Sequence, residues 1–455
     1  MREIVRNSPR FFLLALVGAL ALRLVFILKL PAITSDSLVY GDIAKNWLQH
    51  GIYGLSGIHE VSPTHIRLPG YPVFLAFVFA IFGVDHYRAA LVLQMFVDIG
   101  TCFLVADIAR RLISSQAAKI AFALAAFCPF LANYAGAALS ETWEIFFTAL
   151  ALDFALAGIA NSRSLHWIGC GFAVGGAILL RPDGGLLLLA IELYLGWLLL
   201  RRLASREDLA TIFNAAVIVC VCALVPLGPW TLRNYRTFHE FQPVAPRYAN
   251  EENTFVALGF ERWVRTWIVD YASTEEIYWS VPGSSIDADQ LPSRAFDSKQ
   301  QKDETEQLLD DYNRQLRVTP DLDKRFAELA SERIHDAPAR YYLWLPLLRI
   351  TDMWLRPRTE ILPCNTRWWE FDEETRWLVL SMALAILNLF YIAASLAGVV
   401  RARHVPFLGL LLTFVLLRSA FLGTLENPET RYTLECYPVV IVLVAAAFAP
   451  RMRET

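Results

Sequence analysis

The sequence predicts an all-α polytopic membrane protein with about ten transmembrane helices, interfacial juxtamembrane helices and a partly helical extracytoplasmic segment. Hydrophobic residues make up 56% of the 455 residues and charged residues 19%, and the mean hydropathy is +0.40. Several apolar runs approach the length of about 20 residues that a helix needs to cross a bilayer. A chain this apolar is not expected to be a soluble protein, and no basic cluster indicates nucleic-acid binding.

The first apolar run is expected to be an uncleaved signal-anchor. Arg2, Arg6 and Arg10 precede the run 11–30, which has no small-residue cleavage site at its end. All the apolar runs, in chain order, are 11–30, 71–83, 88–109, 117–135, 141–160, 166–181, 184–200, 211–230, 378–399, 405–422 and 433–449.

The distribution of arginine and lysine decides which runs cross the membrane. If every run did, the basic residues after 109 and after 200 would lie outside, against the positive-inside rule. The run 71–83 would form a helix of about 20 Å, shorter than a hydrocarbon core of about 30 Å. We therefore expect it to lie along the outer interface, with both termini cytoplasmic. The basic residues then expected inside are Arg110, Arg111, Lys119, Arg163, Arg201, Arg202, Arg206, Arg401, Arg403, Arg451 and Arg453.

This topology divides the chain into three parts. Residues 1–230 form an N-terminal transmembrane module whose first external loop is 31–87. Residues 378–455 supply the C-terminal transmembrane helices. The extracytoplasmic segment 231–377 shows charged helical patterns at 299–317 and 322–335 and a second interfacial helix near 341–354.

The stretch "SDSLVYGDIAKNW" (35–47) places an acid where the chain leaves the first predicted span. Aromatic and aliphatic residues at helical spacing follow, which predicts an interfacial helix over 37–49. This acid is Asp36, the second residue of the stretch. Its structural alternative is an N-cap of that helix, because aspartate is a favoured capping residue.

Ionisable side chains gather at the outer membrane surface in this topology. Each costs a few kcal/mol at membrane depth unless it is paired or faces a cavity. Carboxylates together with arginines indicate a site for an anionic ligand at which the acids do proton chemistry. The set is Asp36, Arg67, Glu141, Arg181, Asp183, Arg233, Arg236, Glu426 and Arg431.

Structural explanations stay open for the members of this set. Arg181 and Asp183 would cap helix ends or pair with each other, and Arg431 would pair with Glu426 in one loop. Glu141 would suit the helix dipole in a first turn. Snorkelling explains Arg67, and interfacial anchoring explains Arg233 and Arg236. Arg23, Glu192 and Arg418 lie deeper and are expected to be structural.

Three stretches resemble the GT-C glycosyltransferases, particularly the bacterial branch related to protein O-mannosyltransferases and the aminoarabinose transferases of lipid A. They are Asp36 with Tyr40, "RLPGYPVFLAFVFAIFG" (67–83) and "PWTLRNYRTFHEFQPV" (229–244). "LLRPDG" (179–184) and "ETRYTLECYP" (429–438) look like further markers.

The resemblance implies a catalytic centre with Asp36 as principal acid and Glu141 as second acid. It implies that the substrate-binding residues are Tyr40, Arg67, Tyr71, Arg181, Arg233, Arg431 and Tyr432. Arg67 stands where relatives carry a lysine, but the acid that precedes that lysine is replaced here by His65 and Ile66.

No metal site is indicated by the sequence. The histidines show no ligand spacing, and His59 and His65 are expected to be solvated loop residues. No cofactor is assigned, and a divalent metal is left open without support from ligand spacing.

The resemblance implies a glycosyltransferase that moves a hexosyl or pentosyl group, with inversion, from a polyprenyl-phosphate carrier to a lipid, glycan or protein acceptor. Its expected location is the bacterial inner membrane, with the site on the extracytoplasmic side. The alternative hypothesis is a lipid-linked sugar transporter or flippase without transferase activity, which would usually show repeated halves and broken helices at the midplane. Here the charges gather at one surface, which favours the enzyme.

Overall fold

The computed structural model describes residues 1–205, 209–250, 254–370 and 374–450 of the chain. The chain divides into two compact units, of which the first contains Met1–Glu252, Phe390–Leu417 and Leu434–Thr455. The second contains Asn253–Leu389 and Arg418–Thr433. Arg206, Arg451 and Arg453, which are predicted to be cytoplasmic, lie outside the described residues.

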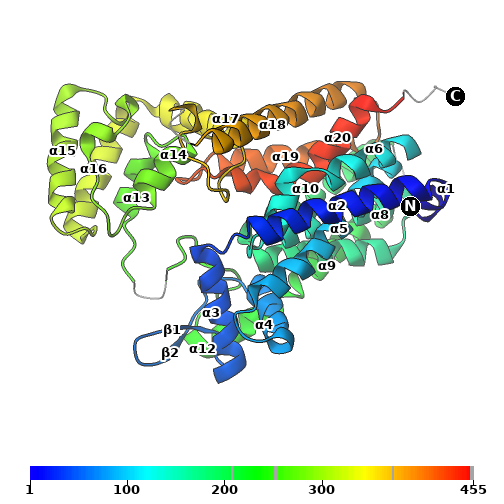
Figure 1. The fold of residues 1–455 in the computed structure, drawn as a ribbon, viewed down its shortest axis with the longest axis horizontal. Coiled ribbons are helices and arrows are strands. Elements are labelled where there is room, and N and C mark those ends of the chain that lie inside the picture. Colours follow the sequence, from blue (N-terminus) through cyan, green and yellow to red (C-terminus); the bar gives the residue numbers. More distant parts are fainter. Residues whose placement is uncertain (206–208, 251–253, 371–373, 451–455) are drawn as a thin grey trace. The chain divides into compact units, whose positions relative to one another are not determined.

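The first unit is a helical bundle with one small hairpin, and most of its elements are labelled in Figure 1. Its helices before the hairpin are α1 (Arg2–Asn7), α2 (Pro9–Lys29) and α3 (Ser35–His50). Strands β1 (Gly54–Ser56) and β2 (Val61–Pro63) pair antiparallel, with Gly54 opposite Pro63 and Ser56 opposite Val61. The elements that follow are α4 (Gly70–Phe82), α5 (Tyr87–Leu112), α6 (Ser115–Ala126), α7 (Pro129–Ala135), α8 (Glu141–Asn161), α9 (Ser164–Leu180), η1 (Pro182–Gly184), α10 (Gly185–Ser205), α11 (Ala210–Leu224), α12 (Leu227–Phe238) and α20 (Tyr437–Phe448).

The second unit contains a helical subdomain with its own apolar core. Trp263, Trp267 and Phe326 are fully buried in this core. Its helices are α13 (Leu258–Arg265), α14 (Tyr271–Ser273), α15 (Lys299–Asn313), α16 (Pro320–Asp336) and α17 (Leu345–Leu355), with short η helices at Thr274–Tyr278, Ala288–Gln290, Ser293–Ala295, Arg340–Trp344 and Trp368–Glu370. Helices α15 and α16 lie where the charged patterns predict them. The aromatic segment predicted near 341–354 forms the η helix at Arg340–Trp344 and helix α17.

Three elements have residues in both units. They are α18 (Thr375–Arg401), α19 (Leu408–Leu422) and η7 (Thr430–Cys436).

The predicted fold class is confirmed, because almost all regular structure in the described residues is helical and much of it is apolar. Among the described residues, six helices are long and apolar enough to cross a membrane, or eight if each of two bent pairs counts as one span. Two other predicted spans form shorter helices, α9 with 17 residues and α19 with 15. A total of ten spans therefore stays a prediction.

A buried arginine explains one of the bent pairs. Arg23 in α2 has no exposed surface, and its Nε donates to Asp98 of α5 at 2.6 Å. Its guanidinium also donates to the carbonyls of Ala125 and Ala126, where α6 ends and α7 begins after a bend of 52°. Carbonyls freed by a helix break need partners inside a membrane, and Arg23 supplies them.

The second bent pair joins α11 to α12 at an angle of 41°. Pro226 lies between the two helices. Proline removes a backbone donor and clashes with the preceding turn, so a bend at this position is expected.

Helix α4 tests the predicted topology. It has 13 residues, and at 1.5 Å per residue it measures about 20 Å, too short to cross a bilayer. A cysteine in place of Val84, which is 40% exposed just beyond α4, should react from outside intact cells with an impermeant thiol reagent. Ser164→Cys, beside Arg163 on the predicted cytoplasmic side, should react only after permeabilisation.

The unsubstituted chain supplies the background, because it carries 7 cysteines of its own. Labelling of Val84→Cys only after permeabilisation would show that α4 crosses the membrane.

Candidate functional site

The start of α3 is capped by Thr34 and Ser37, not by Asp36. These two residues form a capping box, in which each side chain accepts from the other's backbone N–H. The structural alternative for Asp36 is therefore wrong, because the helix begins at Ser35 and has another cap. The Asp36 carboxylate instead accepts a hydrogen bond from Nη2 of Arg67 at 2.9 Å.

Buried contacts on one side of α3 fix the orientation of Asp36. Ile43 packs with Tyr53, Leu68 and Trp230 in a small apolar core. Tyr40, one turn after Asp36, is also buried. Because residues three and four apart share a helix face, this core presents Asp36 and Tyr40 together toward Arg67.

Tyr40 lies at the centre of the charged side chains. The guanidinium of Arg67 lies 5.9 Å from the centre of its ring. Burial, followed by the charge of Asp36, raises the pKa of Tyr40 to about 12, and the charges of Arg67, Glu141 and Arg181 also act on its phenol. Tyr40 is therefore a neutral hydrogen-bond donor at physiological pH.

The second acid, Glu141, is the first residue of α8 and only 3% exposed. The guanidinium of Arg181 lies 3.8 Å from Glu141, 3.9 Å from Glu144 and 3.4 Å from Asp183. These distances exceed those of charge-assisted hydrogen bonds, about 2.8 Å. Arg181 does pair with Asp183, as its structural alternative states, but it also faces two acids of α8.

Glu144 belongs to this acidic group although the sequence gives it no role in the site. It is 1% exposed, and its carboxylate accepts a hydrogen bond from the hydroxyl of Ser140. Its spacing of three residues from Glu141 on one helix is the signal that places both on the same face.

A backbone bridge brings the two acids together. Ala32 and Ala137 form an isolated parallel β-bridge. The Ala32 N–H donates to the Gly136 carbonyl, and the Ala138 N–H donates to the Ala32 carbonyl, each at 2.9 Å. Asp36 lies four residues after Ala32 and Glu141 lies four residues after Ala137. The bridge therefore aligns the two segments that lead into α3 and α8.

A buried amide supports this bridge from α5. The Tyr71 hydroxyl donates to Oε1 of Gln94 at 2.5 Å, and Nε2 of Gln94 donates to the Ala137 carbonyl at 2.8 Å. Gln94 has no exposed surface, and the Tyr71 ring packs edge-on against Tyr40 with centroids 5.1 Å apart. Buried hydrogen bonds of this kind fix geometry, because an unpaired amide is costly there.

The RLPGYP segment approaches the end of α9 closely. A Cβ atom on Gly70 would lie 2.6 Å from the Leu179 carbonyl oxygen, closer than atoms can pack. Glycine thus allows the segment that carries Arg67 to lie beside the segment that carries Arg181.

Arg233 holds the hairpin in place. Its guanidinium donates to the carbonyls of Tyr53 at 2.6 Å and Thr64 at 2.7 Å, and the Tyr53 hydroxyl donates to the Arg67 carbonyl at 3.0 Å. These contacts support a role in positioning Arg67, and a direct contact of Arg233 with substrate stays a prediction. His65, expected to be solvated, is instead 4% exposed and packs against Phe238.

Arg431 and Tyr432 belong to the second unit. Arg431 pairs with Glu429 at 2.6 Å, and Glu426 pairs with Arg265 at 3.2 Å. The anticipated pair between Arg431 and Glu426 stays a prediction. The Tyr432 hydroxyl also donates to Glu429. The contribution of these two residues to substrate binding stays a prediction.

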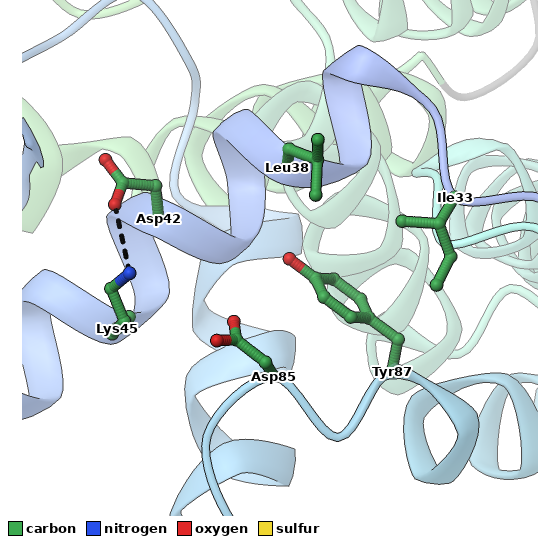
Figure 2. Close-up of a pocket in the computed structure, with 6 residues that line it drawn as sticks. All are labelled: Ile33, Leu38, Asp42, Lys45, Asp85 and Tyr87. Carbon is green, nitrogen blue, oxygen red and sulfur yellow. Dashed lines mark ion pairs between the residues drawn. The ribbon is translucent and has the colours of Figure 1, made fainter.

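An open cleft of about 510 Å³ lies on the other face of α3. Figure 2 shows Leu38, Asp42 and Lys45 of α3 facing Asp85 and Tyr87 across it, with Asp42 paired to Lys45. Neither Asp36 nor Glu141 lines this cleft, so the acid site is separate from it. No group of three or more His, Cys, Asp or Glu is arranged for a metal ion in the part of the chain that the structure describes.

Removal of the Gln94 amide should loosen the bridge. Gln94→Met fills similar space but cannot donate to the Ala137 carbonyl, so the amides of Ala32 and Ala138 should exchange hydrogen about tenfold faster, as expected for the loss of about 1 to 1.5 kcal/mol. Hydrogen–deuterium exchange with mass spectrometry measures this.

Thr101→Val is the matched control. It removes a buried hydroxyl from the same helix, where Thr101 donates only to the Val97 carbonyl within its own turn. Equal protection of the 30–34 and 136–140 peptides in both variants would contradict a supporting role for Gln94.

A family model described as dolichyl-phosphate-mannose-protein mannosyltransferase matches residues 63–230, which include Arg67, Glu141 and Arg181 but not Asp36. A comparison with curated proteins finds no match.

Two solved structures are similar at low identity. One is an oligosaccharyltransferase from Archaeoglobus fulgidus in complex with an inhibitory peptide and a dolichol-phosphate, with 14% identity, a TM-score of 0.48 and 96% of this chain covered. This chain spans about half of that protein, 50% of its length. The other is ArnT from Cupriavidus metallidurans bound to undecaprenyl phosphate, with 13% identity, a TM-score of 0.41, and coverage of 96% of this chain and 78% of that one. Over residues 63–230 the chain is similar to the family of that model, and its motifs at 35–47 and 229–244 resemble those of the GT-C membrane glycosyltransferases.

Proposed function

We propose that this protein transfers a sugar from a polyprenyl-phosphate carrier to an acceptor hydroxyl at the extracytoplasmic membrane surface, with inversion at the anomeric carbon. The arrangement of two acids around Tyr40, each beside an arginine, carries this proposal. The description of the matched family, which names a dolichyl-phosphate-mannose donor, supports the donor class.

Asp36 is proposed as the general base. The acceptor oxygen attacks the anomeric carbon, the bond from that carbon to the phosphate oxygen breaks, and the acceptor proton passes to the Asp36 carboxylate. The Asp36 side chain is 31% exposed, so an acceptor can reach it. The electron pair of the broken bond leaves on the polyprenyl phosphate.

Arg67 and Arg181 are proposed to bind that departing phosphate. Negative charge grows on the phosphate in the transition state, and fixed guanidinium groups stabilise it most where water is excluded. Arg67 pairs with Asp36 at 2.9 Å. A phosphate that takes over this contact would leave the carboxylate able to accept the proton.

Glu141 is proposed to orient the acceptor or the sugar ring. It is nearly buried beside Glu144 and Arg181, and a carboxylate in such a place accepts hydrogen bonds from hydroxyl groups. The side chains around Arg67 and Arg181 include more carboxylates than arginines. Carboxylates accept protons and accept hydrogen bonds from sugar hydroxyl groups, so this composition favours a transferase site over a site that only binds an anion.

Asp36→Asn should lower turnover by about two to four orders of magnitude, the usual contribution of general-base catalysis. Asparagine keeps the size of the side chain but cannot take the proton. The assay is transfer from a radiolabelled polyprenyl-phosphate sugar by purified proteins matched for size-exclusion profile. Asp85→Asn, on the exposed turn before α5, should keep wild-type turnover.

Near-normal transfer by Asp36→Asn would show that Asp36 is not the general base, and Glu141 would then be the candidate base. A wild-type protein that transfers from no lipid-phosphate sugar, but moves such a lipid across vesicles, would establish the transporter hypothesis instead.

Arg67→Ala and Arg181→Ala should each raise the donor KM by at least about tenfold, because each removes a charge-assisted bond worth about 1.5 to 3 kcal/mol. Lysine should rescue a bidentate contact only in part. Arg88→Ala, an exposed arginine at the start of α5, is the control. Wild-type donor KM in both alanine variants would return these arginines to a purely structural role.

A further inference from the structure

A second cleft of the first unit lies where four helix ends meet. Helix α8 ends at Asn161 and α9 begins at Ser164, while α10 ends at Ser205 and α11 begins at Ala210. The cleft has a volume of about 220 Å³, and we call it the Arg202 cleft. The residues that line it, from these four helices and from the turns before α9 and α19, are Gly158, Ile159, Ser162, Trp167, Leu195, Leu198, Arg202, Thr211, Ile212, Ala215 and Phe407. None of them belongs to the acid site or to the cleft beside α3.

The predicted topology places the Arg202 cleft on the cytoplasmic side of the membrane. Arg202 is one of the basic residues expected inside, and so is Arg163, which directly follows the lining residue Ser162. The acid site around Asp36 is expected on the opposite side. A ligand of this cleft therefore comes from the cytoplasmic leaflet or the cytoplasm and takes no part in the proposed transfer.

The polar residues of the Arg202 cleft favour an anion. A guanidinium group offers a planar, permanently charged fork of donors that matches the oxygens of a phosphate. Ser162 and Thr211 add hydroxyl groups, which can also donate. No aspartate or glutamate of the described ranges lines this cleft, whereas Asp42 and Asp85 both line the cleft beside α3. The charge of the site is thus complementary to a phosphate and not to a cation.

The apolar residues indicate that this phosphate belongs to a lipid. Trp167 and Leu195 are buried in the wall of the cleft. Next to the lining residues, Leu203 of α10 and Phe213 of α11 are each 58% exposed, as expected for side chains that contact acyl chains. The cleft is smaller than the pockets of drug-sized ligands, about 300 to 1,000 Å³. It has room for a headgroup, while the acyl chains lie along the apolar surface outside.

Two of the lining residues have an uncommon backbone conformation. Ser162 has φ 52° and Phe407 has φ 70°, in the left-handed region that large side chains rarely adopt. Each such residue costs about 1 to 3 kcal/mol and is found mainly where a ligand or a functional site requires it. The presence of both at one cleft supports a binding role for it.

We propose that the Arg202 cleft binds the phosphate headgroup of an anionic phospholipid of the cytoplasmic leaflet. Basic pockets between membrane-spanning helices on this side are suited to anionic headgroups. A lipid held there contacts the ends of α8, α9, α10 and α11 together, so its binding stabilises the folded state. The inference depends on the predicted topology and is independent of the proposed function.

Native mass spectrometry of the delipidated full-length protein, titrated with phosphatidylglycerol, tests this site. Arg202→Gln should weaken phosphatidylglycerol binding about tenfold, because it removes a charge-assisted hydrogen bond to the phosphate. Arg202→Lys keeps the charge but not the planar fork, so it should lose less. Arg201→Gln is the matched control and should bind like the wild type. Arg201 is the preceding residue of the same helix, and its guanidinium lies 5.6 Å from the centre of the Trp197 ring, outside the cleft.

Two further ligands distinguish an anionic lipid from other occupants. Phosphatidylcholine should bind the wild type about tenfold more weakly than phosphatidylglycerol, and excess inorganic phosphate should not displace phosphatidylglycerol. Equal affinity for the two lipids, or equal binding by the two glutamine variants at matched size-exclusion profiles, would overturn the site. Displacement by inorganic phosphate would overturn the lipid assignment in favour of a free anion. Sugar transfer enters none of these measurements, so a protein without transferase activity would leave the lipid site standing.

Discussion

The pair of backbone hydrogen bonds between Ala32 and the 136–138 segment is the contact on which the site depends. Each bridged alanine precedes an acid by four residues, so the bridge aligns the two segments that lead to Asp36 and Glu141. Arg23 fixes both sides of this bridge. It lies on α2, which leads to Ala32, and it binds the carbonyls at the break before α7, which leads to Ala137. A buried arginine in a span is thus linked by two short chain segments to the acid pair.

Support for the acid pair comes from polar groups whose partners are mostly backbone carbonyls. Gln94 holds the Ala137 carbonyl, and Arg233 holds those of Tyr53 and Thr64. Inside or near a membrane each unpaired polar group costs several kcal/mol, so a mispaired arrangement is strongly disfavoured. These hydrogen bonds hold the backbone of the first unit in one arrangement where the reacting groups are proposed to lie. Charged groups that are already fixed in place stabilise the charge that develops in a transition state, because they need not reorganise during the reaction.

The sequence predicted the helices and the charged residues of the site, because these follow from local hydrophobic pattern and from charge. Hydropathy located the apolar helices, and charge patterning located α15 and α16. The outer-surface set also contained Asp36, Arg67, Glu141 and Arg181, which the structure places together around Tyr40. The Ala32 bridge and the role of Gln94 were not predictable, because they join segments up to 105 residues apart through backbone atoms that have no sequence signature. Glu429 was missed as the partner of Arg431 because a loop gives no periodicity by which to choose among nearby acids.

A structure of the protein in lipid nanodiscs with a bound polyprenyl phosphate tests the central claim most directly. The claim is that one site contains both acids, with the phosphate on the arginines of the first unit. We predict phosphate oxygens at hydrogen-bond distance, about 3 Å, from the guanidinium groups of Arg67 and Arg181, with the Asp36 carboxylate facing the phosphorus–sugar side. A phosphate held elsewhere, for example in the cleft between Lys45 and Tyr87, with Arg67 still paired to Asp36, would contradict the account.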